Sequence, residues 1–295
     1  MELWVLIAIG AAFFQNVRSA LQKHLKGQLS TTGATFSRFI FAAPLILGVL
    51  AALITVGGYA APEPTVRFAG FAVLGGLSQI IATALLVHLF GLRNFAVGTT
   101  FSKTETVQAA LFGVIVLSDT ITPMAVVALL ISLAGVVLIS SANGLRGGIL
   151  NKGALIGVAS GTAFAVSGIS YRGASLALGG GDFLIRATFT LACVLVFQTV
   201  IMLVWLAWKD TPQIGRVLKS WRVFAWVGVA GGLASLGWFS AMTLQNAAYV
   251  KAVGQVELLF SFAVSVLIFR ERSSGREVLG IALVSLGILA LLLWR

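Results

Sequence analysis

The sequence predicts an all-α integral membrane protein, with ten transmembrane helices arranged as two inverted five-helix repeats. Of its 295 residues, 59% are hydrophobic and only 10% are charged, and the mean hydropathy is +1.02. This composition leaves too little polar surface for a soluble globular protein, so lipid must be the solvent. An internal duplication and a series of long apolar stretches are the two further observations that predict the fold.

The duplication relates residues 94–135 to residues 246–287 at a constant offset of 152. The aligned pairs are Leu92 with Leu244, Asn94 with Asn246, Glu105 with Glu257, Asp119 with Glu271, and Gly135 with Gly287. Each half contains five apolar stretches, and an odd number of crossings turns the second copy upside down in the membrane. We therefore expect a first repeat over residues 1–145 and an inverted second repeat over residues 146–295.

Ten apolar stretches approach the length of about 20 residues that a helix needs to cross the hydrocarbon core. Runs of this length exclude barrel strands, and lipid-exposed irregular backbone is too costly, so the stretches should be helices. Pro62 and Pro64 separate the second from the third, and Gly179, Gly180 and Gly181 separate the sixth from the seventh. The predicted spans cover residues 3–22, 31–55, 68–88, 95–117, 122–141, 153–177, 183–207, 222–243, 250–269 and 276–294.

The first stretch is expected to be a transmembrane helix rather than a cleaved signal peptide. Glu2 is the only charged side chain before it, whereas a signal peptide begins with a basic region. Residues 8–13 also match residues 159–164 of the sixth stretch, so removing the first would unbalance the duplication.

The net charge of +11 is distributed unevenly between the two sides of the predicted bundle. The loops after odd-numbered spans hold 12 of the 20 lysines and arginines, and the opposite loops hold four. The positive-inside rule then places the odd loops in the cytoplasm and both termini outside. No basic run is interleaved with aromatic residues, which argues against a nucleic-acid partner.

Apart from the residues assigned to the loops and span ends, six charged residues lie inside the spans, although each costs about 2.5–3.5 kcal/mol near the bilayer centre on insertion scales. Such residues normally face a wet cavity or a partner of opposite charge. For the two glutamates, one interpretation is a structural ion pair or hydrogen bond, and the other is proton coupling or ligand binding. The six residues are Arg18, Arg38, Lys103, Glu105, Arg186 and Glu257.

The fourth span carries a polar stripe at helical spacing, formed by Thr99, Ser102, Lys103 and Thr106. A stripe on one helix face is expected to contact water or substrate; the alternative is hydrogen bonding to the preceding turn or between helices. Glu105 points away from Lys103 around the helix, so Lys103 needs another partner. Glu257, from the opposite repeat, is a candidate.

Three further residues are candidate substrate contacts. Arg38 and Arg186 are equivalent at an offset of 148 and should lie toward opposite membrane faces, where each could snorkel, pair with a carboxylate or bind an anionic substrate group. Trp238 could contact substrate, or it could be packed or interfacial. The small-residue pairs Gly157/Gly161 and Gly228/Gly232 predict close helix packing.

These features resemble the EamA-type branch of the drug/metabolite transporter superfamily over essentially the whole chain. The resemblance is carried by the arginine early in the second span of each repeat, the segment 94–105, the hairpin 117–119, and the segment from Glu257 to Gly287. It implies ten helices around a central cavity and transport of small metabolites, often export of amino acids or drugs. The chain departs from the family pattern where a proline commonly follows the glutamate, since Thr106 and Leu258 stand there. Family members are usually drawn with cytoplasmic termini, the reverse of what the charges favour here.

We therefore expect a secondary transporter of the cell inner membrane that moves an amino acid-like or drug-like metabolite by alternating access. A lipid or lipid-linked sugar flippase of the same fold is the alternative. An enzyme is not expected, because the sequence has no H-E-x-x-H or G-x-S-x-G motif. ATP is not expected to drive transport, because no G-x-x-x-x-G-K-[ST] loop is present. The expected partners are a small-molecule substrate and membrane lipid, with proton coupling open, no cofactor or metal, and no oligomer required.

Overall fold

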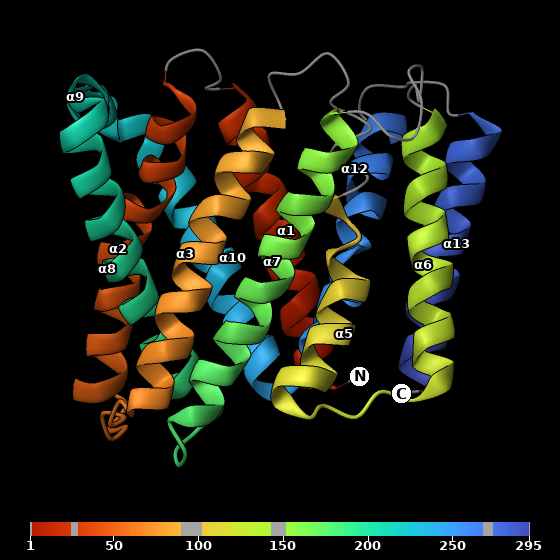
Figure 1. Cartoon of the computed structure of the whole chain (residues 1–295), viewed down its shortest axis with the longest axis horizontal. Helices are drawn as coiled ribbons and strands as arrows, with labels where there is room; N and C mark the ends of the chain where they lie inside the picture. Colours follow the sequence, from red (N-terminus) through yellow and green to blue (C-terminus); the bar gives the residue numbers. More distant parts are fainter. Residues whose placement is uncertain (1, 25–28, 90–101, 143–151, 268–273, 295) are drawn as a thin grey trace. The chain divides into compact units, whose positions relative to one another are not determined.

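The computed structural model describes residues 2–24, 29–89, 102–142, 152–267 and 274–294, and every element in these ranges is an α-helix (Figure 1). The all-helical fold is therefore confirmed. The helices are α1 (Leu3–His24), α2 (Thr31–Thr55), α3 (Val66–Leu89), α5 (Glu105–Leu117), α6 (Pro123–Ala142), α7 (Lys152–Ala177), α8 (Phe183–Lys209), α9 (Thr211–Lys219), α10 (Trp221–Leu244), α11 (Ala247–Gly254), α12 (Val256–Leu267) and α13 (Gly275–Trp294).

Eight of the predicted spans each correspond to one of these helices, with ends that agree within two residues. Six described helices are long and apolar enough to cross a membrane, namely α2, α3, α7, α8, α10 and α13. Shorter apolar helices occur within α1, α5 and α6. The chain is thus a multi-pass membrane protein, while the count of ten crossings and the enclosed central cavity stay predictions.

The prediction of a continuous ninth span over residues 250–269 is wrong, because the chain divides at Gln255 into α11 and α12. There the backbone makes tight three-residue hydrogen bonds, from Gln255 N–H to the Ala252 carbonyl (3.1 Å) and from Leu258 N–H to the Gln255 carbonyl (2.9 Å). Such 3₁₀ geometry interrupts the regular α-helical ladder. The fourth span shows a related irregularity: Lys103 and Thr104 form a turn before α5, and its residues 95–101 lie outside the described ranges.

The loop predicted between the seventh and eighth spans contains a short helix, α9. Pro212 stands in its first turn, where the missing backbone N–H costs no helical hydrogen bond. Gln213 and Val217, four residues apart, form its buried side.

The helices form two compact units, and each takes helices from both predicted repeats. Unit 1 consists of residues 1–80 and 170–245, and unit 2 consists of residues 81–169 and 246–295. In unit 1, α2 packs against α8 and α10, and α1 packs against α10. The Ser30 N–H before α2 donates to Gln213 Oε1 just after α8 (3.1 Å), so α2 and α8 are antiparallel. Buried apolar side chains between these helices include Phe36, Phe39 and Leu191.

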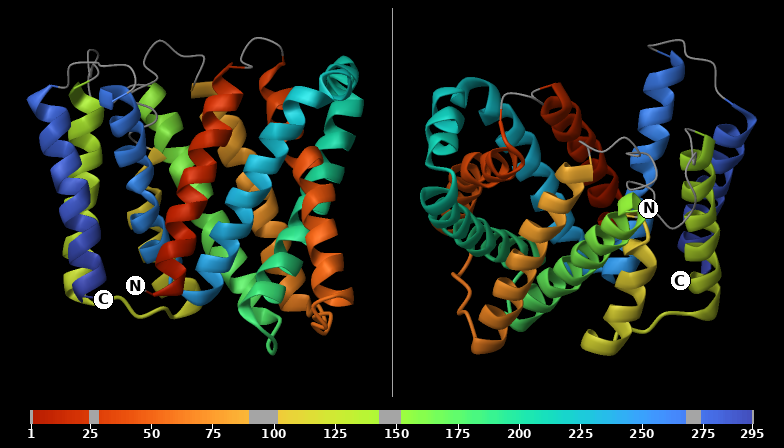
Figure 2. Two further views of the ribbon diagram at one scale, coloured as in Figure 1. Left: turned by 180° about the vertical axis from the view of Figure 1, so that it is seen from behind. Right: turned by 45° about the horizontal axis from the view of Figure 1, so that its top comes forward.

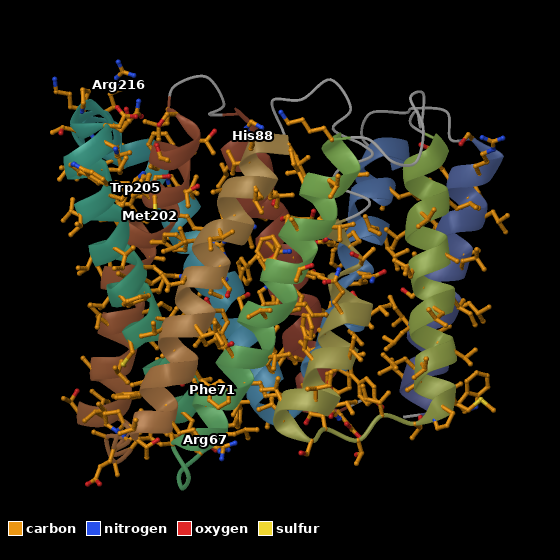
Figure 3. The ribbon with its side chains drawn as sticks, in the orientation of Figure 1. Arg67, Phe71, His88, Met202, Trp205 and Arg216 are labelled. Atoms are coloured by element: carbon orange, nitrogen blue, oxygen red, sulfur yellow. The ribbon has the colours of Figure 1, made fainter. Side chains whose placement is uncertain are left out.

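Both ends of unit 1 carry basic and aromatic side chains, as helix ends at a membrane interface usually do (Figure 3). At one end, Lys209 Nζ lies 3.8 Å from the centre of the Trp208 ring, and Trp208 is 72% exposed. At the other, the Arg67 guanidinium lies 5.7 Å from the centre of the Phe71 ring. These pairs fit a unit that spans the bilayer.

In unit 2, the repeat-equivalent helices α6 and α13 lie side by side and antiparallel (Figure 2). Thr122 Oγ1, beside the start of α6, donates to the Trp294 carbonyl at the end of α13 (2.8 Å). A Cβ atom added at Gly135 would lie 2.6 Å from the Gly280 carbonyl oxygen, and one added at Gly287 would lie 2.7 Å from Ser132 Cβ. The duplicated glycines therefore permit the closest approach of this pair, and its antiparallel course is the one that an inverted duplication requires.

Candidate functional site

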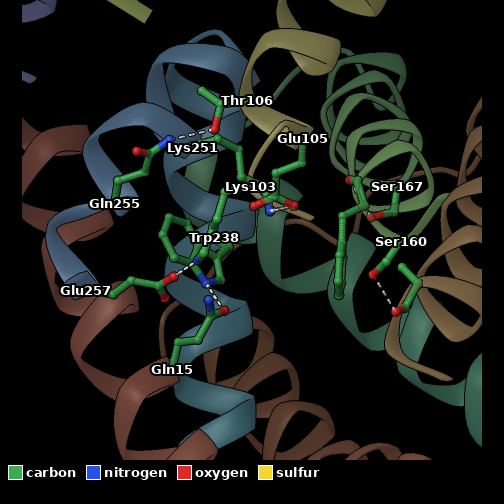
Figure 4. Close-up of polar contacts among 12 residues, drawn as sticks. Gln15, Lys103, Glu105, Thr106, Ser160, Ser167, Trp238, Lys251, Gln255 and Glu257 are labelled. Atoms are coloured by element: carbon green, nitrogen blue, oxygen red, sulfur yellow. Dashed lines mark hydrogen bonds and ion pairs between the residues drawn. The ribbon is translucent and has the colours of Figure 1, made fainter. Parts of the chain in front are cut away.

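The irregular backbone of unit 2 carries polar and charged side chains (Figure 4). Glu105 lies in the first turn of α5, and its repeat equivalent Glu257 lies in the first turn of α12. The amino-terminal end of a helix carries a partial positive charge that stabilises a carboxylate by about 0.3–1 kcal/mol. Lys251 occupies the last turn of α11, where the partial charge is negative and favours a cation.

Two ion pairs connect the repeats within unit 2. Lys103 Nζ pairs with Glu257 Oε1, with side chains that are 24% and 13% exposed. Lys251 Nζ lies 3.6 Å from Glu105 Oε2, and both side chains are 16% exposed. Glu257, the candidate partner of Lys103, is its partner in the structure, and Glu105 pairs with Lys251 instead. Each carboxylate thus has a lysine from the other repeat as its partner.

The lysines do not share the symmetry of the glutamates. At the offset of 152, Lys103 aligns with Gln255, and Lys251 aligns with Thr99. Gln255 is 3% exposed; its Nε2 donates to Thr106 Oγ1 (3.0 Å), and its Oε1 accepts from Ser132 Oγ (2.9 Å). The amide at the position of the first repeat's lysine therefore connects the helix break to α5 and α6.

Helix α7 packs directly on the turn before α5. A Cβ atom added at Gly161 would lie 2.8 Å from the Ser102 carbonyl oxygen and 3.3 Å from the Glu105 nitrogen, so only glycine permits this approach. Three residues further along α7, the ring of Phe164 lies 5.8 Å from Lys251 Nζ, within cation–π range. The predicted close helix packing is confirmed at Gly161, and this packing fixes the turn that carries Lys103 and Thr104.

The described members of the predicted stripe are largely buried. Ser102 is 6% exposed and Thr106 is 2% exposed, and Thr106 forms the interhelical hydrogen bond that was the alternative interpretation. Thr99 lies outside the described residues. The stripe does not lie on one regular helix, because the turn at Lys103 and Thr104 interrupts it. Access of water to these positions stays a prediction.

The remaining candidates, Arg38, Arg186 and Trp238, belong to unit 1. Arg38 is only 7% exposed, so it does not reach water as a snorkelling arginine would. Arg186 Nη1 donates to the Gly179 carbonyl (3.3 Å) beside the start of α8. Trp238 Nε1 donates to Gln15 Oε1 (2.9 Å) and connects α10 to α1. Because α2 and α8 are antiparallel and each arginine precedes the middle of its helix, the two arginines lie in opposite halves of unit 1. Their placement toward opposite membrane faces stays a prediction.

Several polar residues in these sites were not predicted. Lys251 and Gln255 could have been found by aligning the repeats, since they occupy the positions of Thr99 and Lys103. A buried network in unit 1 had no such signal: the Tyr171 hydroxyl lies 2.9 Å from the Gly75 carbonyl oxygen and 3.0 Å from Gln79 Oε1, and Gln198 Nε2 donates to the same Gln79 oxygen (2.9 Å).

Comparison with known proteins identifies relatives of this chain. The model of the EamA-like transporter family matches residues 2–141 and 151–293. A solved structure described only as "Crystal structure of protein" has a TM-score of 0.73 and 17% sequence identity, with 99% of each chain covered, and at this identity it supports the fold alone. The comparison with curated proteins gives no match.

Proposed function

Because the chain belongs to the EamA-like transporter family, we propose that it is a secondary transporter that moves a small metabolite across the cell inner membrane by alternating access. The proposed cargo is amino acid-like or drug-like, and the proposed direction is export. The observation that carries the proposal is the turn at Lys103–Thr104 before α5 and the break between α11 and α12 at Gln255, with ion pairs joining these two places.

Interrupted helices are a recurrent feature of substrate and ion sites in transporters built from inverted repeats. A helix break leaves backbone N–H and C=O groups without intrahelical hydrogen bonds, so these groups can bind substrate or ions. The helix ends at the break also carry partial charges that attract ions. Glu105 and Glu257 stand at two such ends, each beside a lysine of the other repeat. Charged residues in a membrane are costly, which favours a functional reason for keeping four of them together.

The two ion pairs also suggest how cargo and conformation could be coupled. A lysine that pairs with a carboxylate can exchange it for an anionic group of the substrate, and a carboxylate can exchange its lysine for a proton. Lys103 lies just before α5 and Glu105 at its start, and their partners Glu257 and Lys251 lie in α12 and α11. Either exchange therefore removes an ion pair that holds α5 to the break between α11 and α12. In this proposal the rocking motion follows the opening and closing of these pairs.

The test has two stages. Cells that lack or overproduce the chain are first screened for growth in the presence of toxic amino acids and drugs, with Lys103→Met as a comparison at equal membrane abundance. Compounds against which the wild-type chain protects are then loaded into proteoliposomes, and their efflux is measured with and without a pH gradient. We expect protein-dependent flux that falls at least tenfold in Lys103→Met. Efflux no faster than from empty liposomes for every compound would refute the proposal.

A further inference from the structure

Two buried arginines of unit 1 converge on one glycine. Arg18 on α1 is 8% exposed, and Arg38 on α2 is 7% exposed. A Cβ atom added at Gly231 on α10 would lie 3.2 Å from Arg18 Cδ and 3.8 Å from Arg38 Cγ. The glycine therefore gives the Arg18 side chain room that a larger residue would restrict, and the Arg38 side chain lies in ordinary contact range of the same position. The positive charges of the two arginines act on one another.

The arginines lie well inside the unit. Arg38 is seven residues from the start of α2, and Gly231 is ten residues from the start of α10. At a rise of about 1.5 Å per residue, these positions are roughly 10 and 15 Å from the helix ends. That depth corresponds to the hydrocarbon core, where an uncompensated charge is costly.

No carboxylate of unit 1 compensates Arg18. The four acidic residues of this unit lie at helix ends or in connecting segments: Glu2, Glu63, Asp182 and Asp210. Three of them accept hydrogen bonds from other groups. Glu2 accepts from Trp4 Nε1, Asp182 from the Leu184 N–H, and Asp210 from Ser30 Oγ. Arg18 Nε is buried and has no hydrogen-bond partner among the described residues. A second arginine beside it increases the unfavourable charge.

Arg172 of the same unit also has a buried Nε without a hydrogen-bond partner within the described ranges, but its Nη1 has acceptors. Arg172 Nη1 donates to the carbonyl oxygens of Met242 and Gln245, both at 2.8 Å, and so caps the end of α10. Arg18 has no comparable acceptor. Tyr171 belongs to the same buried core as Phe39, the chain neighbour of Arg38, and its hydroxyl accepts from Gln198 Nε2 (3.3 Å). The Gln198 side chain is fully buried, and its Oε1 has no partner in the described part of the chain. Among its described residues, unit 1 thus holds a buried donor and a buried acceptor that are both unused.

We propose that Arg18 and Arg38 form an anion-binding subsite that takes a carboxylate or phosphate group of the transported molecule. A guanidinium group presents parallel N–H donors that match such oxygens in a bidentate manner, and a bound anion would neutralise the buried charge. Anion binding by the two arginines does not depend on the proposed function. Only the assignment of the anion to a transported molecule rests on it. An anionic lipid headgroup carries the same chemistry and is distinguished by the test.

The test measures the melting temperature of the purified full-length protein in a neutral detergent at constant ionic strength. Sodium acetate and inorganic phosphate are the soluble probes, each titrated to 100 mM against chloride, and nanodiscs with or without phosphatidylglycerol are the lipid arm. A probe at about ten times its Kd should raise the melting temperature by roughly 3 °C. In Arg18→Met and Arg38→Met this rise should disappear. Their melting temperatures without probe should equal or exceed that of the wild type, because removing one cation relieves repulsion.

Arg172→Met is the matched control: it should melt lower than the wild type and keep the full response to the probe. A response to phosphatidylglycerol alone would overturn the assignment to a soluble molecule. The inference is also overturned if neither probe raises the melting temperature, or if Arg18→Met melts lower without probe and responds like the wild type. Because binding is measured without flux, a positive result would stand even if the protein transported nothing, and a negative one would leave measured transport unaffected.

Discussion

The replacement Glu257→Gln tests the ion pair at the break between α11 and α12. Glutamine keeps the shape of the side chain but removes the charge that compensates Lys103. Breaking a buried ion pair by removing one partner costs about 3–5 kcal/mol. Lys103 is 24% exposed, which allows some hydration, so we expect a loss of about 3 kcal/mol. At roughly 2–4 °C per kcal/mol for a large domain, the melting temperature should fall by about 6–12 °C.

Two variants separate the ion pair from other effects of the substitution. The double variant Lys103→Met/Glu257→Gln removes both charges and should recover most of the lost stability. Glu277→Gln makes the same change in the first turn of α13, where the carboxylate accepts hydrogen bonds from the Ser274 N–H and Oγ at an exposed position. It should cost less than about 1 kcal/mol, as an exposed helix cap does.

The assay combines thermal unfolding in nanodiscs with flux driven by a pH gradient. If the carboxylate also carries a proton, Glu257→Gln should lose uphill transport and retain exchange. Glu105→Gln should also lower the melting temperature, because its carboxylate lies 3.6 Å from Lys251 Nζ in a pair of similar burial. The reasoning is refuted if Glu257→Gln melts within 1 °C of the wild type and its flux still responds fully to the gradient.

Three other predictions follow from single positions. Gly161→Val should reduce thermal stability and transport, because the larger side chain forces α7 away from the turn before α5. Gly10→Ala should leave both unchanged, since no atom lies within 4 Å of the added Cβ, and equal melting temperatures for the two variants would contradict the packing at Gly161. Gln255→Leu leaves two buried hydroxyl groups without their amide partner and should lower stability by about 1–3 kcal/mol in denaturant unfolding, and no loss would mean that these groups bond elsewhere. A reporter active only outside the cytoplasm should be active when fused after Arg295 and silent in the segment at Arg216, and the opposite pattern would reverse the orientation that the loop charges predict.

The features that the sequence predicted well depend on local composition. A membrane helix must be apolar along its whole length and ends where polar residues, proline or glycine begin, so hydropathy alone placed eight helices within two residues at each end. The duplication is also visible in one dimension, and it indicated that Glu105 and Glu257 are equivalent. The cost of an unpaired charge in lipid indicated that Lys103 needs a partner and made Glu257 a candidate, which the structure then selected.

The tertiary structure decided the features that depend on neighbours from distant parts of the chain. Hydropathy does not distinguish a continuous helix from one interrupted at Gln255, because the segment is apolar on average. The interruption appears in the 3₁₀ hydrogen bonds of the backbone, and the Gln255 side chain bonds there to Thr106 and Ser132. Likewise, Arg18 and Arg38 are 20 residues apart on different helices, and nothing local brings them to Gly231. Side-chain partners in a helical bundle are set by which helix faces meet, and that depends on packing of the whole unit rather than on any single segment.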